Sequence, residues 1–407
     1  MTHRLPHAFR LLAGANLGAQ SAEQLSLAAV PLVAVLALGS GAAEIGMLGA
    51  MQTLPFLLLS IPMGLLTDRL PRRSVMLFSE VVRAVSLLLL LVVVASGSTS
   101  FAALAVLGFI GAVGTVGFTV AAPALVPALV PVNLHARANG RLELARSAAY
   151  AGGPALAGAL VAWAGAASAF VLATILSVAA VALLWRVSEP PRPRVPARHP
   201  LHDIGEGLRF VWRDTLLRPV LLTGIAWNIA WFVLQAAYVP YAVRILGLSA
   251  QAVGVTMGCY GAGMVLGALL APRVIGAMPF GRAIQLGPAV SVFAMGAMVA
   301  TVAAPTGLLA GLSFFLFGAG PIIWTITTTT LRQAMTPGAM LGRVGAVFLT
   351  VNAGARPVGA GIGAVVGGLW GETACLWLAL AGFVLQAGII LASSMNGLQR
   401  LPELKGT

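Results

Sequence analysis

The chain has 407 residues, of which 59% are hydrophobic and 9% are charged. Soluble domains carry about 25% charged residues, so the composition excludes an ordinary soluble domain and indicates an integral membrane protein. The net charge of +13 would suit a protein that binds nucleic acid, but the arginines fall mainly between apolar stretches. That pattern is typical of membrane topology, and we expect no nucleic-acid partner.

Twelve apolar stretches approach the roughly 20 residues that a helix needs to cross the hydrocarbon. The first begins after a basic N-terminus without a cleavage site, so we expect a retained helix rather than a signal peptide. Transmembrane helices are predicted near residues 10–38, 46–66, 75–96, 101–123, 139–163, 165–186, 218–243, 250–272, 283–303, 306–331, 343–367 and 371–394.

One long polar segment, residues 187–217, separates the sixth stretch from the seventh. Its proline-rich start predicts an extended linker. Four apolar residues then follow at helical spacing, which predicts an amphipathic helix on the membrane surface. These residues are Leu201, Ile204, Leu208 and Val211.

The two sides of this linker show related patterns. "GRLELARSAAYAGGP" and "GRVGAVFLTVNAGARP" each pair a Gly-Arg with a proline about 14 residues on, as expected of a transporter with repeated halves. We therefore predict an all-α membrane protein with two pseudo-symmetric six-helix bundles, residues 1–186 and 218–407, joined by the linker 187–217.

The positive charges predict the orientation. Arg244 is the only Lys or Arg expected on the side opposite the termini and the linker, apart from three arginines inside helices. The positive-inside rule then places both termini and the linker in the cytoplasm. The expected location is a bacterial inner membrane, crossed many times.

The stretch "GLLTDRLPRRS", residues 64–74, gathers four charges between two apolar helices. It is either a solvated turn or a mechanical latch. It resembles the signature loop G-x-L-x-D-R-x-G-R-R of the major facilitator superfamily, with Pro71 in place of the second glycine. The matching residues are Gly64, Leu66, Asp68, Arg69, Arg72 and Arg73.

We favour the latch. A carboxylate at Asp68 would stabilise the N-terminus of the helix expected over 343–367 by roughly 0.3–1 kcal/mol, and it would do so only while the cytoplasmic side is closed. A conformational latch is therefore expected from Gly64, Asp68, Arg69, Arg72, Arg73, Arg83, Arg146 and Arg343.

A second resemblance lies in residues 140–158, which are similar to the antiporter motif G-x8-G-x3-G-P-x2-G-G of the same superfamily. Ala149 and Ala157 replace two of its glycines. The resemblance implies an exporter, although ordinary small-residue packing would leave the same pattern. The matching residues are Gly140, Gly153, Pro154 and Gly158.

Further segments, such as "IGEGLRFVWRDTLLRPVL", resemble the branch of the superfamily that holds macrolide-efflux proteins, enterobactin exporters and lysophospholipid transporters. The resemblance implies a secondary exporter of amphipathic organic molecules, either drugs, siderophores or other natural products, driven by proton antiport through alternating access. A lysophospholipid or lipid flippase of the same fold is the alternative. Neither an enzyme nor a cofactor or metal site is expected.

Charged groups inside a bilayer are costly and therefore mark function. Glu23 lies halfway along the first helix, where burial favours the neutral acid and suits proton exchange; a neutral, structural carboxyl group is the alternative. Glu80 and Glu143 each precede an arginine by three residues. These pairs either neutralise themselves locally or join Asp68 in a charge network, and both carboxylates are further candidates for proton coupling.

Arg356 is expected near mid-membrane, where a carboxylate such as Glu23, backbone carbonyls, water or an anionic part of a substrate would have to meet it. Aromatic and amide side chains suit a cavity for amphipathic compounds, while interfacial packing is the structural alternative. The cavity candidates are Asn16, Gln20, Glu23, Gln24, Trp227, Asn228, Trp231, Gln235, Trp324, Thr327, Asn352 and Arg356. The expected partners are a small-molecule substrate, protons and membrane lipid, and the expected state is a monomer.

Overall fold

The protein was described by a computed structural model that covers residues 5–131, 134–190, 200–337 and 340–401. Over these residues the regular structure is helical, and strands are absent. The chain divides into two compact units. Unit 1 comprises Met1–Ser40, Met51–Arg198 and Ser249–Val255, and unit 2 comprises Gly41–Ala50, His199–Leu248 and Thr256–Thr407.

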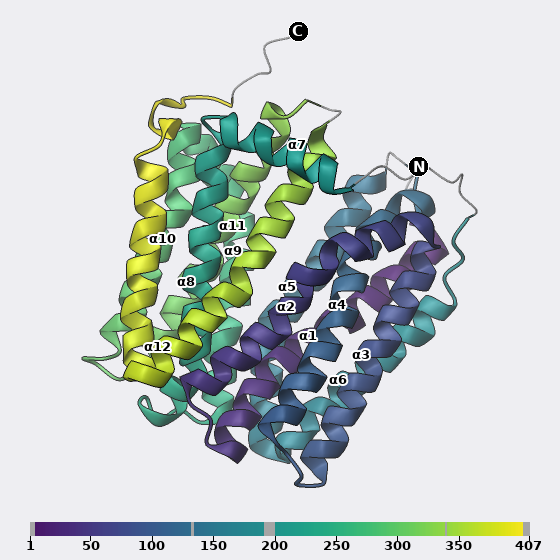
Figure 1. The fold of residues 1–407 in the computed structure, drawn as a ribbon, viewed down its shortest axis with the longest axis vertical. Coiled ribbons are helices and arrows are strands. Elements are labelled where there is room, and N and C mark those ends of the chain that lie inside the picture. Colours follow the sequence, from purple (N-terminus) through teal and green to yellow (C-terminus); the bar gives the residue numbers. More distant parts are fainter. Residues whose placement is uncertain (1–4, 132–133, 191–199, 338–339, 402–407) are drawn as a thin grey trace. The chain divides into compact units, whose positions relative to one another are not determined.

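Unit 1 is built mainly from six long helices, except that the start of α2, up to Ala50, belongs to unit 2. Within it α1 packs against α5 and α6, and α3 packs against α4 and α6 (Figure 1). Its core contains Phe9, Leu12, Phe118 and Leu125, all essentially inaccessible to solvent. The helices are α1 (His7–Leu38), α2 (Ala42–Arg69), α3 (Arg72–Ala95), α4 (Phe101–Leu129), α5 (His135–Ala164) and α6 (Ala166–Trp185).

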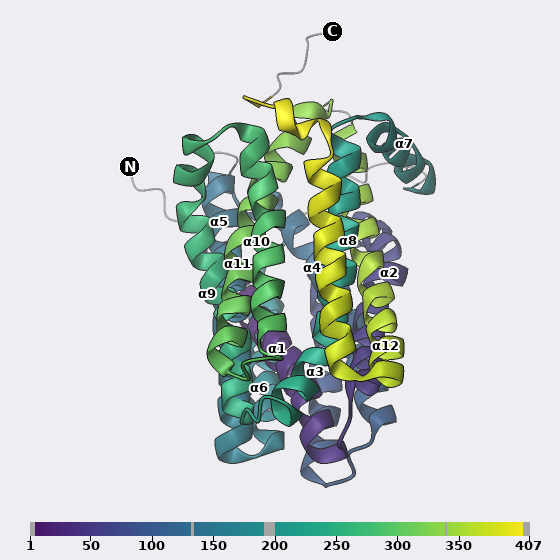
Figure 2. The same cartoon turned by 90° about the vertical axis from the view of Figure 1, so that its left-hand side faces the viewer.

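Unit 2 holds a short helix, five long ones and a terminal 3-10 turn, except that the start of α9, up to Val255, belongs to unit 1. α12 packs against α8 and against α10 (Figure 2), and α10 also packs against α11. The short helix α7 contacts α8 and α12 and lies across their ends (Figure 1). The elements are α7 (Pro200–Arg213), α8 (Leu217–Arg244), α9 (Ala250–Ala277), α10 (Phe280–Ala300), α11 (Gly307–Met335), α12 (Leu341–Leu391) and η3 (Ser394–Gly397).

The helix α12 is two membrane spans joined end to end. Gly371 interrupts its 51 residues with φ 79° and ψ 176°, a conformation that glycine adopts without a steric penalty. The break lies at the predicted boundary between the spans 343–367 and 371–394.

Ten helices of the described chain are long and apolar enough to cross a membrane, with α12 counted once. The helix α5 is not among them. Division of α12 at Gly371 and inclusion of the 30-residue α5 give the twelve spans expected from the sequence. The predicted fold class is confirmed.

Candidate functional site

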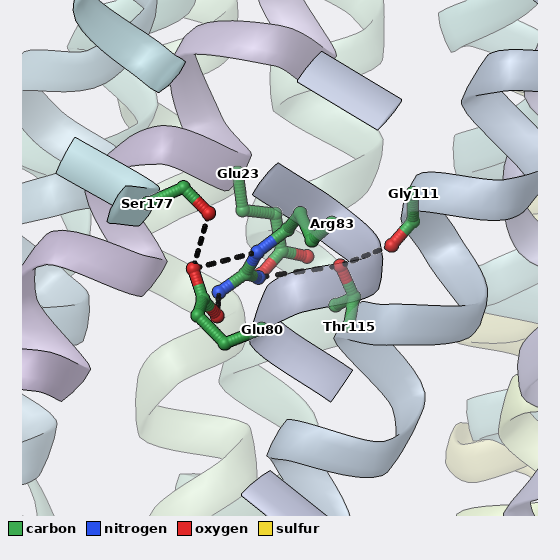
Figure 3. A network of polar contacts seen from close by, with 6 residues as sticks. All are labelled: Glu23, Glu80, Arg83, Gly111, Thr115 and Ser177. Carbon is green, nitrogen blue, oxygen red and sulfur yellow. Dashed lines mark hydrogen bonds and ion pairs between the residues drawn. The ribbon is translucent and has the colours of Figure 1, made fainter. Parts of the chain in front are cut away.

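A buried ion network lies in the interior of unit 1 (Figure 3). Glu80 and Arg83 lie one turn apart on α3, and the Arg83 guanidinium donates hydrogen bonds to the Glu80 carboxylate from Nη2 and from Nε, the latter at 3.3 Å. Glu23 of α1 approaches the same guanidinium, with 3.8 Å between its Oε2 and Arg83 Nη1. Three formal charges are therefore gathered inside a membrane-spanning bundle.

Two hydroxyl groups complete this network from two further helices. Ser177 of α6 donates to Glu80 Oε1 at 2.5 Å. Thr115 of α4 accepts from Arg83 Nη1 at 3.3 Å and donates to the carbonyl of Gly111. The network thus ties α1, α3, α4 and α6 together, as Figure 3 shows.

Small residues allow the helices to approach closely at this point. A Cβ atom added to Gly114 of α4 would lie 2.4 Å from the Ser79 carbonyl oxygen and 3.0 Å from Arg83 Cβ. Phe118, one turn further along α4, faces the Arg83 guanidinium with 5.5 Å from Cζ to the ring centroid, a favourable cation–π geometry. The glycine therefore brings α4 near enough for its hydroxyl and its ring to contact the cation.

The two carboxylates of the network have different environments. The Glu80 side chain is 0% exposed and Arg83 is 4% exposed, whereas the Glu23 side chain is 17% exposed. With all three groups ionised the network carries one excess negative charge, which is costly in a low-dielectric interior. One proton would neutralise it, and Glu23 is the carboxylate that water reaches.

The helix α5 packs against α1 beside Glu23. A Cβ atom added to Gly153 would lie 2.5 Å from Gln24 Cβ, so this glycine permits the contact. Gln24 is 4% exposed, and its Nε2 has no hydrogen-bond acceptor among the described residues. In the same unit, a Cβ atom on Gly158 would lie 2.4 Å from the carbonyl oxygen of Ala250.

Unit 2 contains a different polar cluster, between α8 and α12. Arg356 Nε donates to Asn228 Oδ1 at 3.4 Å, and Asn228 Nδ2 donates to Asn352 Oδ1 at 3.3 Å. A Cβ atom at Gly224 would lie 2.6 Å from Asn352 Oδ1, so glycine there makes room for the amide. The cluster consists of one guanidinium and two neutral amides.

Aromatic side chains gather beside this polar cluster. The rings of Trp227 and Trp231 stack with centroids 5.3 Å apart and an angle of 11° between their planes. Trp231 also contacts Tyr260 at 5.2 Å and Phe317 at 5.1 Å, and Phe317 contacts Phe383 at 4.8 Å. These rings form a large, rigid apolar surface. Trp227, which belongs to it, directly precedes Asn228 on α8.

Other predicted cavity residues lie apart from these two clusters or contact other groups. Trp324 packs with the apolar core around Val344 and against Gly287 of α10, and the Thr327 hydroxyl donates to the carbonyls of Ile323 and Trp324 on its own helix. Asn16 donates to the Leu142 carbonyl of α5 at 3.3 Å. Gln20 and Gln235 are half-buried on α1 and α8.

The arginines of the signature loop contact the ends of other helices of unit 1. The backbone N–H groups of Arg72 and Arg73 donate to the Glu189 carboxylate at 3.2 and 2.8 Å, which places a negative charge at the N-terminus of α3. The Arg73 guanidinium donates to the carbonyls of Leu184 and Trp185 at the end of α6. Both arginines therefore contribute to packing within the unit.

The remaining residues that were predicted to form the latch lie apart from one another and contact different partners. Arg146 pairs with Glu143 on the surface of α5, with both side chains well exposed, and Arg343 pairs with Glu206 of α7 at 2.5 Å. Arg69 is exposed, and Gly64 and Gly140 have open space where a Cβ would lie. The Asp68 side chain lies outside the described part of the structure, and the latch and the Glu23–Arg356 pairing stay predictions.

Sequence reasoning did not single out Ser177, Thr115 or Tyr260. Ser177 and Thr115 are hydroxyl residues within long apolar helices, which is a weak signal because such residues often bond their own backbone. Only the packing of α4 and α6 on α3 distinguishes them from the other serines and threonines of the chain.

Comparison with known proteins decides the family. Residues 12–360 match the Major Facilitator Superfamily. The chain belongs to the Major Facilitator Superfamily. This confirms the resemblance found in the sequence, and it assigns the protein a role in membrane transport rather than catalysis.

Two curated relatives are similar at low identity. The uncharacterized MFS-type transporter y4rN of Sinorhizobium fredii is 28% identical over 60% of this chain, and the match spans only 60% of that relative. The enterobactin exporter EntS of Citrobacter koseri is 26% identical over 84% of this chain and 80% of its own length.

Solved structures share the fold. A POT family transporter in complex with 5-aminolevulinic acid has a TM-score of 0.76 and 13% identity, covering 95% of this chain and 96% of its own. A bacterial homologue of the iron transporter ferroportin, in an inward-facing state, has a TM-score of 0.74 and 17% identity, covering 94% and 98%. At these identities the likeness concerns the superfamily fold alone.

Proposed function

We propose that this protein is a secondary exporter that exchanges protons for amphipathic organic molecules by alternating access. The observation that carries the proposal is the network of Glu23, Glu80 and Arg83, in which two carboxylates share one guanidinium inside a transmembrane bundle. Ionisable groups at membrane depth are retained mainly for function because their burial is costly.

Glu23 is the proton carrier of this proposal. Glu80 is held by both Arg83 and Ser177 and has no exposed surface, so its charge is already compensated. Glu23 is closer to water and farther from the guanidinium. Protonation of Glu23 removes the excess negative charge, and loss of the proton restores an ion pair with Arg83.

Proton exchange at Glu23 is coupled to helix packing through α5. Gly153 of α5 rests on Gln24, the next residue of α1. A change in the charge of Glu23 would therefore alter the packing at the α1–α5 contact, where the sequence resembles the antiporter motif. That resemblance, together with similarity to an exporter of enterobactin, favours export over uptake.

The proposed setting is a bacterial inner membrane with both termini and the α6–α7 segment in the cytoplasm, as the distribution of arginines favours. Cysteine labelling of Ser188→Cys in whole cells tests this orientation. We expect a membrane-permeant reagent to be required, and ready labelling by an impermeant reagent would reverse the topology.

Proton coupling is tested with purified protein in liposomes that enclose a pH-sensitive dye. A panel of amphipathic fluorescent compounds and a lysophospholipid is screened for saturable movement driven by a pH gradient. With a compound that moves, Glu23→Gln should abolish gradient-driven flux, because an amide cannot exchange a proton, while exchange of labelled for unlabelled compound without a gradient persists.

Glu44→Gln is the matched control, since Glu44 is an exposed carboxylate that caps the Gly41 N–H at the start of α2. It should retain wild-type flux. Gradient-driven flux that is undiminished in Glu23→Gln contradicts proton coupling at this residue. Movement of the lysophospholipid alone would replace the exporter proposal by a lipid flippase.

A further inference from the structure

We propose that a cavity beside α7 binds the phosphate headgroup of an anionic phospholipid. The cavity belongs to unit 2 and has a volume of about 520 Å³. Its walls come from α7, from the short connection to α8 and from the residue before α12. The lining residues are Glu206, Arg209, Phe210, Arg213, Asp214 and Met340. The proposed ligand is a lipid of the surrounding membrane and not the transported molecule.

The cavity lies at the depth of the lipid headgroups. Asp214 stands three residues before α8, which begins at Leu217, and Met340 directly precedes α12, which begins at Leu341. Both helices are long and apolar enough to cross a membrane, so their first residues stand at the boundary between hydrocarbon and water. α7 lies across the ends of these helices (Figure 1). The phosphates of the lipids around the protein lie at this same level.

Two arginines give the cavity its positive charge. Arg209 and Arg213 are four residues apart on α7 and therefore lie on the same side of the helix. Both are exposed, and within the described part of the chain neither makes a hydrogen bond or an ion pair with another side chain. Two guanidinium groups at one cavity suit a phosphate, whose oxygens accept paired hydrogen bonds from arginine.

The two carboxylates of the cavity have partners of their own. Glu206 accepts a hydrogen bond from Arg343 of α12 at 2.5 Å. Asp214 Oδ1 accepts from the backbone N–H groups of Leu216 and Leu217, each at 2.8 Å. This contact places its charge at the start of α8, where the helix dipole favours a negative group. The carboxylates are therefore stabilised without the two arginines of the cavity, which remain available to an anion.

An exposed apolar pair on α7 favours a lipid over a soluble phosphate. Leu208 is 41% exposed and Trp212 is 52% exposed, and their spacing of four residues places them on one side of the helix. Tryptophan side chains are enriched among lipid headgroups, and arginines near the surface attract anionic lipids. Helices that lie in the membrane interface combine these two features, whereas a soluble phosphate would have no contact for the apolar pair.

The opposite face of α7 fixes the helix to the bundle. Val211 is 0% exposed and packs in the core that includes Leu217 and Val344. A Cβ atom added to Gly207 would lie 2.9 Å from the carbonyl oxygen of Arg343, so glycine allows α7 to rest directly on α12. The arginines of the cavity are thus held in place before a ligand arrives, which lowers the entropic cost of binding.

The test is native mass spectrometry of the purified full-length protein in detergent, titrated separately with dioleoylphosphatidylglycerol, dioleoylphosphatidylcholine and glycerol phosphate. The wild type should bind its first molecule of phosphatidylglycerol more tightly than phosphatidylcholine, which has the same acyl chains but no net charge. The double variant Arg209→Gln, Arg213→Gln should lose this affinity by about 10- to 30-fold, as expected when two basic residues near an anionic surface are removed. Glycerol phosphate should bind far more weakly because it lacks the acyl chains.

The matched control is the double variant Arg273→Gln, Arg282→Gln. These arginines are exposed near the end of α9 and the start of α10 and do not line the cavity. Their loss changes the net charge by the same amount, yet binding of phosphatidylglycerol should stay nearly as in the wild type. Arg209→Lys with Arg213→Lys should retain most of the affinity, because lysine keeps the charge. All four arginines are exposed, so we expect unchanged unfolding temperatures.

Three results would overturn the proposal: equal affinity of the wild type for the two phospholipids, unchanged binding in Arg209→Gln, Arg213→Gln, or an equal loss in the control variant. The last result would show attraction to the overall charge of the protein rather than binding at a site. Glycerol phosphate that binds as tightly as phosphatidylglycerol would assign the cavity to a soluble phosphate and exclude the lipid. No proton gradient or transported compound is present, so the outcome is independent of the Glu23 experiment.

Discussion

The polar clusters of the two units surround their arginines with different chemical groups. Arg83 in unit 1 meets two carboxylates, a threonine hydroxyl and a phenylalanine ring, and is almost fully buried. Arg356 in unit 2 is half-buried and is oriented by amides beside stacked indoles. The first cluster holds two carboxylates around one guanidinium, which suits proton exchange, whereas the contacts described in the second cluster join its guanidinium to neutral amides.

The largest effect should follow removal of the cation from the first cluster. Arg83→Gln leaves Glu23 and Glu80 facing each other without a counter-charge. Breaking a buried ion pair on one side costs about 3–5 kcal/mol, so we expect a marked fall in unfolding temperature in detergent and loss of gradient-driven flux. Thermal unfolding of the purified variant measures the first effect.

Two further variants separate charge from packing in that experiment. The pair Glu143–Arg146 has the same i,i+3 spacing as Glu80–Arg83 but lies on the surface, and Arg146→Gln should cost no more than about 1 kcal/mol. The double variant Glu80→Gln, Arg83→Gln should recover part of the stability lost in Arg83→Gln. Equal losses for the buried and exposed arginines would remove the distinction between the two pairs.

A smaller effect is expected from the helix contact beside Glu23. Gly153→Ala introduces a Cβ 2.5 Å from Gln24 Cβ, and overpacking of this kind costs about 1–3 kcal/mol. The neighbouring Gly152 has nothing within 4 Å of an added Cβ, so Gly152→Ala should be neutral or slightly stabilising. Similar unfolding temperatures for the two variants would show that α5 does not pack tightly on α1.

The smallest effect should come from the hydroxyl that accepts from Arg83. Thr115→Val keeps the shape of the side chain but removes this acceptor, at a cost of about 0.5–1.5 kcal/mol. Because the guanidinium is then free to turn toward Glu23, gradient-driven flux should persist with an altered dependence on pH. Thr325→Val, whose hydroxyl donates to the Pro321 carbonyl of its own helix, should leave that dependence unchanged.

The sequence by itself determined the number of membrane helices and their approximate positions. A chain in hydrocarbon must satisfy its backbone within each span, so apolar stretches of about 20 residues could only become helices, and the boundary expected between 343–367 and 371–394 lies at the break in α12. The positions of Glu23 and Arg356 within apolar stretches also identified them as charges at membrane depth, whereas Glu80 was expected in a local pair or in a charge network with Asp68. The signature loop identified the superfamily, which the match over residues 12–360 confirms.

Only the tertiary structure decided which of these charges meet. Ser177 and Glu80 are 97 residues apart in the chain, and Arg356 and Asn228 are 128 apart. A transmembrane helix is apolar on nearly every face, so its hydrophobic pattern does not reveal how it is rotated about its axis. That rotation is set by close contacts such as those of Gly114 with Ser79 and Gly224 with Asn352, and these contacts place Arg83 among carboxylates and Arg356 among amides.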